Sequence, residues 1–271
     1  MPSRSRAPSR SGGPISSGSE NFLGNIHGAE FVLVDMTGKV TLAIGLAALG
    51  LTGCDETSRR AVTGPPLHDM QTVELDKAEM VRVEMRMGAG ELNVAGGSSR
   101  LLDADFEYIL PQSKPVVRYQ ASSFRGQLTI AQPSGDSRAG SPYEWKLRLN
   151  NGVPMDVVAR LGAGNAEMNL GVLDLRGVEV HMGVGNLDMD LRGDPKRDYD
   201  VEIHGGVGNA TVRLPAGVGI VANARGGIGN IDAQGLEKRN GRWVNARHED
   251  AKITIHLDIR GGVGNITLLA N

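Results

Sequence analysis

Two aspartates occupy positions at which a polysaccharide-cleaving enzyme could have its catalytic carboxyl groups. Asp188 and Asp190 alternate along one short segment, so in an extended chain both side chains lie on one face. Glycoside hydrolysis needs two convergent carboxyl groups on an exposed surface. At the corresponding positions of the next repeat, however, the chain has Thr211 and Arg213. The pattern favours a solvated strand face, and we predict a protein that is not an enzyme.

Two histidines also occupy corresponding positions of successive repeats. His181 and His204 could in principle share a metal ion, because imidazole nitrogen is a common metal ligand. A protein zinc site needs at least a third ligand, and no column of carboxylates or thiols lies unambiguously beside the histidines. We therefore predict no metal site and no other cofactor.

The composition excludes several classes of protein. Of the 271 residues 38 are glycine, without the three-residue period of collagen. The hydrophobic fraction of 40% is enough for a folded core. The formal net charge of −2 gives no electrostatic reason to expect nucleic acid as a partner. A single cysteine excludes a disulfide framework, so the glycines must serve backbone geometry.

A four-residue unit, Gly-small-Gly-Asn, recurs five times in the second half of the chain. The first glycines stand at positions 162, 183, 206, 227 and 262, so the spacings are 21, 23, 21 and 35 residues. A fixed period of this size is typical of stacked supersecondary units. The predicted corner residues are Gly162, Gly164, Asn165, Gly183, Gly185, Asn186, Gly206, Gly208, Asn209, Gly227, Gly229, Asn230, Gly262, Gly264 and Asn265.

The flanks of each unit alternate between apolar and polar residues, as in VEVHM at 178–182 and LDMDL at 187–191. Period two predicts half-buried strands on both sides of a glycine corner. The fold class is therefore all-β, a parallel β-solenoid with coils of about 21–23 residues. We expect the asparagines to hydrogen-bond in a ladder and the residue between the two glycines to point inward.

The same pattern predicts the order of the domains. Residues 72–160 should form irregular coils, about three of them between Gly88 and Gly162, and residues 161–271 should form the regular repeats. The last spacing is 14 residues longer than the period of 21, which predicts a hairpin insertion at 236–249. The chain continues for six residues after Asn265 without an obvious cap, so we expect the last coil to be an exposed edge, which makes a homodimer possible.

Three segments resemble one protein family. RMGAGELNVAGGSSRLLDADFEY at 86–108, EWKLRLNNGVP at 144–154 and the Gly-x-Gly-Asn repeats resemble the toast-rack family of bacterial envelope proteins. They are also similar to related adhesin domains and to the C-terminal domain of LiaF-type cell-wall stress regulators. The resemblance covers about 75–271. It implies a β-solenoid-like, non-catalytic envelope domain, and it supplies no catalytic residues.

The N-terminal part contains a predicted targeting signal. Lys39 precedes an uncharged, mostly apolar run, and Leu51-Thr52-Gly53-Cys54 resembles the bacterial lipobox. We therefore predict a lipoprotein signal peptide at 36–53, lipidation of Cys54 and a tether at 54–71. Residues 1–35 are expected to be disordered or an over-extended gene start. The predicted location is the bacterial cell envelope, lipid-anchored, with the periplasmic face of a membrane favoured.

Two groups of residues are candidates for contacts with a partner. A column of basic residues lies two positions before the first glycine of each unit and includes Arg225 and Arg260. It is either neutralised by a neighbouring acidic column or free to contact an anionic envelope polymer or lipid headgroup. In the insertion, Trp243 with Arg239 and Arg242 forms either an interaction site or a lid on the solenoid.

These patterns favour one function over two alternatives. The first is a membrane-anchored envelope lipoprotein that acts as a non-catalytic interaction or adhesin-like scaffold, with an envelope protein or anionic polymer as a possible partner. The second is an envelope-stress regulatory module that binds a membrane sensor. The third is a polysaccharide-active β-helix enzyme.

Overall fold

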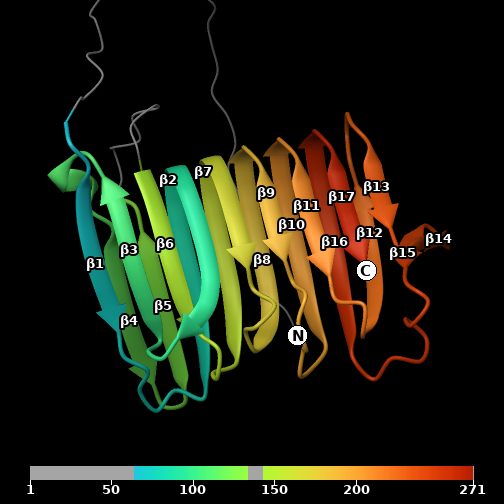
Figure 1. Ribbon diagram of the computed structural model, residues 1–271, viewed down its shortest axis with the longest axis horizontal. Helices are drawn as coiled ribbons and strands as arrows, with labels where there is room; N and C mark the ends of the chain where they lie inside the picture. The colour runs from blue at the N-terminus through green and yellow to red at the C-terminus, as the bar shows by residue number, and fades with distance from the viewer. Residues whose placement is uncertain (1–63, 134–142, 271) are drawn as a thin grey trace, which may run out of the picture. The chain divides into compact units, whose positions relative to one another are not determined.

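The computed structural model describes residues 64–133 and 143–270 (Figure 1). The described residues all belong to one compact unit, Ser58–Asn271. The predicted signal peptide and Cys54 lie outside the described residues. None of the described residues belongs to a helix with the length and hydropathy needed to cross a membrane.

Seventeen strands of one sheet and a short 3-10 helix make up the described part of the chain, which confirms the predicted all-β fold. In chain order the elements are β1 (Leu67–Val73), β2 (Met80–Ser98), β3 (Leu102–Tyr108), η1 (Pro111–Ser113), β4 (Val116–Ser122), β5 (Arg125–Ala131), β6 (Tyr143–Asn150), β7 (Met155–Asn169), β8 (Leu175–Val184), β9 (Leu187–Asp190), β10 (Tyr199–Val207), β11 (Ala210–Leu214), β12 (Gly219–Arg225), β13 (Ile231–Gln234), β14 (Glu237–Arg239), β15 (Arg242–Val244), β16 (Thr254–Val263) and β17 (Ile266–Ala270).

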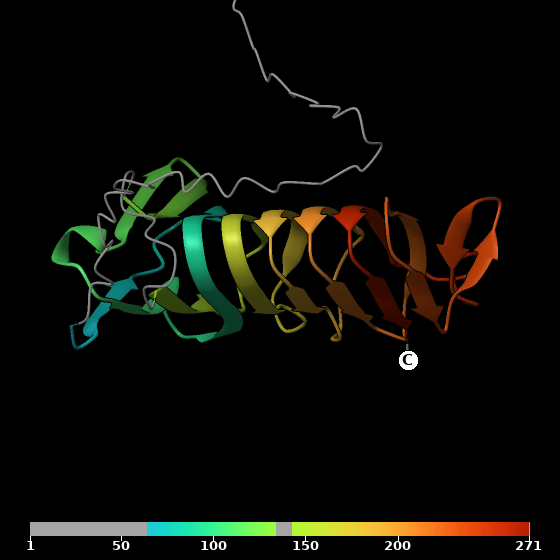
Figure 2. The same cartoon turned by 90° about the horizontal axis from the view of Figure 1, so that it is seen from above.

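The sheet folds at the glycine corners into two layers. The first layer contains the strands before the corners, in the order β4, β5, β2, β7, β8, β10, β16, β12, β15 and β14. The second layer contains the strands after the corners, in the order β1, β3, β6, β2, β7, β9, β11, β17 and β13. β2 and β7 run through the corner unbroken, so each belongs to both layers (Figure 2).

The regular coils pair in parallel and in register, so like residues lie beside like residues. In the first layer Ile203 pairs with Val180 on one side and with Ile259 on the other. In the second layer Val212 pairs with Met189 and Leu268. All six side chains are buried between the layers, with exposed fractions of 3% or less. The alternation of the sequence thus correctly identified the core-facing positions, because period two assigns one face of a strand to the core.

The coils do not stack in sequence order. The last coil, β16 and β17, lies between the coil of β10 and β11 and the coil of β12 and β13 (Figure 1). The expectation of an exposed last coil is therefore wrong, and the end of the stack is the coil that contains Gly227. The longer last spacing explains the order, because the additional residues let the chain pass around the end coil and return inside it.

The predicted hairpin exists, and it closes the end of the first layer. Asn240 and Gly241 have φ values of 49° and 80°, as a two-residue hairpin turn requires, and they connect β14 to β15. β15 pairs antiparallel with β12, the last strand of the first layer. Nearby, the buried Asn245 side chain accepts a hydrogen bond from the Ile220 N–H at 3.0 Å and donates one to the Val218 carbonyl at 2.7 Å. The segment is thus a cap rather than a loop outside the core.

The opposite end of the stack differs from the three irregular coils that we expected between Gly88 and Gly162. β2 and β7 are direct neighbours, so the intervening chain does not separate them. On the other side of β2, β5 and β6 pair in parallel with its two halves and together correspond to one coil. β1, β3 and β4 pair antiparallel and complete this end. Antiparallel strands can follow one another through short turns, which the coil spacing does not encode.

The coil order can be tested by disulfide cross-linking in the unit 58–271, which lacks Cys54. Val207 and Val263 are register partners, whereas Val263 separates Val207 from Ile228. Adjacent strands lie about 4.8 Å apart, within the Cα range of a disulfide, and strands two apart do not. The pair Val207→Cys with Val263→Cys should therefore cross-link on mild oxidation. The pair Val207→Cys with Ile228→Cys should not, and efficient cross-linking of this control would contradict the order.

Candidate functional site

The corners bring the backbones of neighbouring coils closer than a side chain allows. A Cβ atom on Gly206 would overlap the carbonyl oxygen of Gly183, and a Cβ atom on Gly208 would overlap that of Gly185. Gly208 also has a φ of 142°, a value that residues with a Cβ rarely adopt. Both glycines of the unit are therefore required. The first allows the close approach of the two backbones, and the second allows both the close approach and the unusual backbone conformation.

The asparagines form the expected ladder along the corner. The side-chain oxygen of Asn186 accepts hydrogen bonds from the backbone N–H and the side-chain amide of Asn209, at 3.1 and 3.3 Å. The oxygen of Asn209 in turn accepts from the backbone N–H of Asn265 at 3.0 Å, and that of Asn265 from the N–H of Asn230 at 3.1 Å. The ladder follows the spatial order of the coils, with Asn165 at its start.

The residue between the two glycines points outward, which corrects our expectation. Met182 and Leu187 are both buried although they are an odd number of positions apart, so the alternation must break between them. The break falls at the corner, where Gly185 has a φ of 138°. The residues around the bend therefore lie on its convex, solvent side. Aliphatic side chains there form an exposed row, which we call the corner ridge: Ala163, Val184, Val207, Val263 and Ile228.

A basic row follows the corner ridge on the first layer. It lies two positions before the first glycine and, in spatial order, consists of Arg86, Arg160, His181, His204, Arg260 and Arg225. One pleat farther from the corner lies an acidic row that includes Glu84, Glu179, Glu202 and Asp258.

The two rows neutralise each other over most of their length. Arg86 binds Glu84 at 2.8 Å, and Arg160 reaches Glu84 at 3.6 Å and Glu179 at 2.8 Å. The His181 ring lies 2.7 Å from Glu179. The hydrogen bond from Arg86 holds the pKa of Glu84 below its ordinary value, and the hydrogen bond from His181 does the same for the pKa of Glu179. Both carboxyl groups therefore stay ionised beside their basic partners at neutral pH.

The two candidate arginines of this row differ. Arg260 forms an ion pair with Asp258 at 2.9 Å. Arg225 is exposed, and within the described residues it forms no ion pair. The interpretation as mutual neutralisation therefore holds at contact distance for Arg260, whereas Arg225 acts on Asp258 only through a longer-range electrostatic interaction.

A groove of about 850 Å³ runs along the basic row beside the corner. Arg86, Arg160, His181 and His204 line it, together with the corner glycines, and Gln132 closes one end. The rings of His181 and His204 stack with centroids 4.9 Å apart and planes within 6°. No group of three or more potential metal ligands occurs in residues 64–133 and 143–270.

Gln132 is a site residue that the repeat did not predict. Its side-chain oxygen accepts hydrogen bonds from the N–H groups of Gly88 and Ala89, at 2.6 and 3.2 Å. Gln132 thus occupies the place of a preceding coil at the first corner. No sequence signal marks it, because its partners lie more than 40 positions away and belong to another strand.

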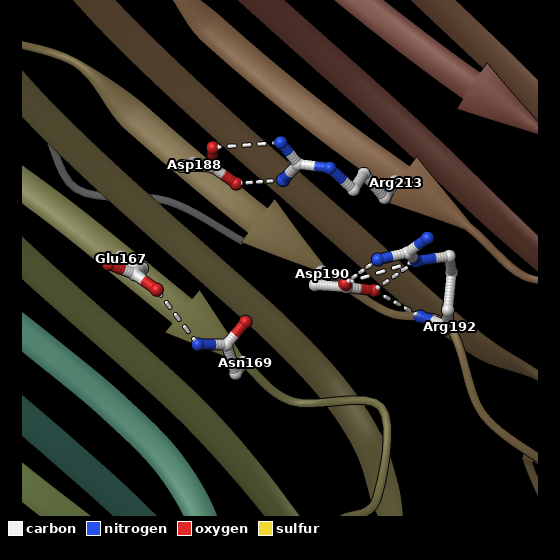
Figure 3. Close-up of polar contacts among 6 residues, drawn as sticks. All are labelled: Glu167, Asn169, Asp188, Asp190, Arg192 and Arg213. Carbon is white, nitrogen blue, oxygen red and sulfur yellow. Dashed lines mark hydrogen bonds and ion pairs between the residues drawn. The ribbon is translucent and has the colours of Figure 1, made fainter.

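The two aspartates that could serve catalysis are engaged with arginines (Figure 3). Both terminal nitrogens of Arg213 bind the Asp188 carboxylate, with Nη2 3.1 Å from Oδ2. Arg192 binds Asp190 through Nη2 at 2.6 Å and Nε at 3.0 Å, and these hydrogen bonds hold the pKa of Asp190 below its ordinary value. A glycosidase acid needs a raised pKa so that it carries a proton at neutral pH. The geometry therefore supports a structural role for this pair.

Trp243 forms part of the end cap. It is partly buried, packs against the core and pairs with Ala222 of β12. Lys238 lies over its ring at 5.4 Å. Arg239 binds Glu237 at 3.0 Å, and Arg242 is exposed at the end of the turn. Of the two alternatives for Trp243, this geometry matches the lid.

The stacked coils, glycine corners and paired outer charges define a two-layered, β-solenoid-like protein. The chain belongs to the toast-rack family, because the model of its N-terminal domain, DUF2154, matches residues 63–213, more than half of the chain. This confirms the resemblance that the sequence indicated.

A solved structure shows the same fold. A putative cell adhesion protein from Clostridium sporogenes is 32% identical, with a TM-score of 0.73, and the match covers 75% of this chain and 98% of that chain. A putative adhesin from Bacteroides fragilis is 12% identical, with a TM-score of 0.29 and coverage of 76% and 98%. Because the TM-score of the second structure is low, its similarity supports no conclusion about this chain. A search of curated proteins finds no match.

Replacing Gly208 with valine should destabilise the stack strongly. The new Cβ meets the Gly185 carbonyl oxygen, and valine cannot adopt the φ of Gly208 without strain. We expect a loss of at least about 3 kcal/mol in the free energy of unfolding. Gly226→Val is the matched control, because a Cβ there meets nothing within 4 Å. Similar melting temperatures for the two variants would contradict the corner geometry.

The asparagine ladder makes a second, finer prediction. Asn209→Ala removes both the acceptor for the Asn265 N–H and the bond to Asn186, so it should cost about 1 kcal/mol. Asn230 ends the ladder, and its side chain forms no hydrogen bond with the described residues. Asn230→Ala should therefore leave the free energy of unfolding, measured by chemical denaturation, nearly unchanged. Equal losses for both variants would argue against a cooperative ladder.

Proposed function

We propose that the protein is a cell-envelope lipoprotein, anchored through acylated Cys54, whose toast-rack domain is a non-catalytic, adhesin-like interaction scaffold. The observation that carries the proposal is the pairing of its outer charges. Asp188, Asp190, Glu84 and Glu179 each hold a basic partner at contact distance. Charges that are paired in this way stabilise a surface and are unavailable for proton transfer.

Two further observations support a scaffold. The stack has an in-register corner at every coil, which suits a surface that presents the same groups at a fixed spacing. The Clostridium sporogenes protein, which shares this fold at 32% identity, is described as a putative cell adhesion protein. The envelope location that the toast-rack resemblance implies also fits the predicted signal peptide before Cys54.

The lipid anchor is testable in a bacterial host. Cys54→Ala removes the only thiol of the chain, so the variant should lose incorporation of labelled palmitate and move from the detergent phase to the aqueous phase. Ser58→Ala is the matched control and should behave as the unchanged chain does. Palmitate incorporation that persists in Cys54→Ala would refute the anchor.

A further inference from the structure

The corner ridge is an unusual surface for a soluble domain. Ile228, Val184, Val207 and Val263 have exposed fractions of 73%, 55%, 51% and 45%. Single exposed aliphatic residues are ordinary, but these four are neighbours in consecutive coils. With strands about 4.8 Å apart, the row from Ala163 to Ile228 extends over about 19 Å.

The charges beside the ridge are ordered by distance from it. The basic row is the first row of side chains on the first layer, and the acidic row lies one pleat farther away. On the other side of the ridge come the neutral asparagines, and only beyond them Glu167 and Asp188. A flat surface that touches the ridge therefore meets aliphatic groups first, then arginines, and the carboxylates last.

This order matches the chemistry of an anionic bilayer. Apolar side chains enter the boundary between headgroups and acyl chains, while basic side chains remain at the level of the phosphates. Arg225, which has no ion pair within the described residues, lies in the coil of Ile228, the most exposed member of the ridge. The most exposed apolar side chain and an arginine without an ion pair at contact distance thus coincide in the end coil.

We propose that the corner ridge docks on the anionic lipid surface to which the chain is anchored, with the basic row in contact with the lipid phosphates. The inference rests on the proposed lipid anchor for the presence of a bilayer nearby. The ten residues from Asp55 to Gly64 span at most about 36 Å when extended, so the anchor keeps the domain close to the bilayer surface. Docking along the ridge would place the stack along the membrane and leave the second layer accessible to partners.

The test uses the unit 58–271 without its anchor. This unit has its own core, and the crystallised Clostridium sporogenes relative corresponds to it over 98% of that chain. Binding is measured by co-sedimentation with vesicles of phosphatidylcholine alone and of phosphatidylcholine with phosphatidylglycerol. We expect binding to the anionic vesicles that weakens with salt.

The ridge variant combines Val184→Thr, Val207→Thr, Val263→Thr and Ile228→Thr, which keep a branched Cβ and remove apolar surface. It should bind anionic vesicles about tenfold more weakly. The control variant carries Met70→Thr, Val116→Thr and Val172→Thr, at exposed apolar positions away from the ridge. It should bind as the unchanged unit does. Arg225→Gln should weaken binding to the anionic vesicles and leave the melting temperature unchanged.

Four results would overturn the proposal. The first is no binding of the unchanged unit to either vesicle. The second is equal binding by the ridge and control variants. The third is binding to polyphosphate that the ridge variant preserves, which would identify a polymer site instead. The fourth is a dimer in sedimentation analysis that the ridge substitutions dissociate, which would make the ridge a contact between copies. Because the unit lacks Cys54, none of these results depends on whether Cys54 is acylated.

Discussion

The close approach of backbones at the glycine corners is the constraint on which the rest of the structure depends. Each corner glycine lies against the carbonyl oxygen of the glycine in the neighbouring coil, at a separation that leaves no room for a Cβ. A shift of one residue in register would bring a side chain into that space. The corners therefore align every strand on both layers, and the rows of core residues, asparagines and charges follow from this alignment.

In-register stacking places like residues beside like residues, and each row meets this condition differently. Asparagine is both donor and acceptor, so the ladder satisfies itself. Arginines repel one another, and the acidic row one pleat away compensates, because Glu84 pairs with Arg86 and Glu179 pairs with Arg160. His181 and His204 stack face to face between arginines. Aliphatic residues on the convex side of the corner have no such compensation, and they accumulate as an exposed ridge.

The two ends of the stack are closed by different means. At one end Gln132 takes the place of a missing corner, the parallel strands β5 and β6 pair with β2, and the antiparallel strands β4 and β3 cover them. At the other end β15 covers the edge of β12, and Trp243 packs against the core. Short, capped edges limit pairing with further strands. The final coil, β16 and β17, lies in the interior of the stack, where it contacts a coil on both sides.

The sequence by itself determined the strands, the corners and the family, because these depend on local features. Alternation assigned residues such as Ile203 and Val212 to the core, and the need for a residue without a Cβ identified Gly206 and Gly208. Tertiary structure alone decided the order of the coils, the position of Gln132 and the outward direction of Val207. Repeats that share the same apolar pattern and corner unit fit beside one another in more than one order, so their order depends on the length and pairing of the connections. The direction of a corner side chain depends on which side of the bend the core fills, and no period in the sequence records that.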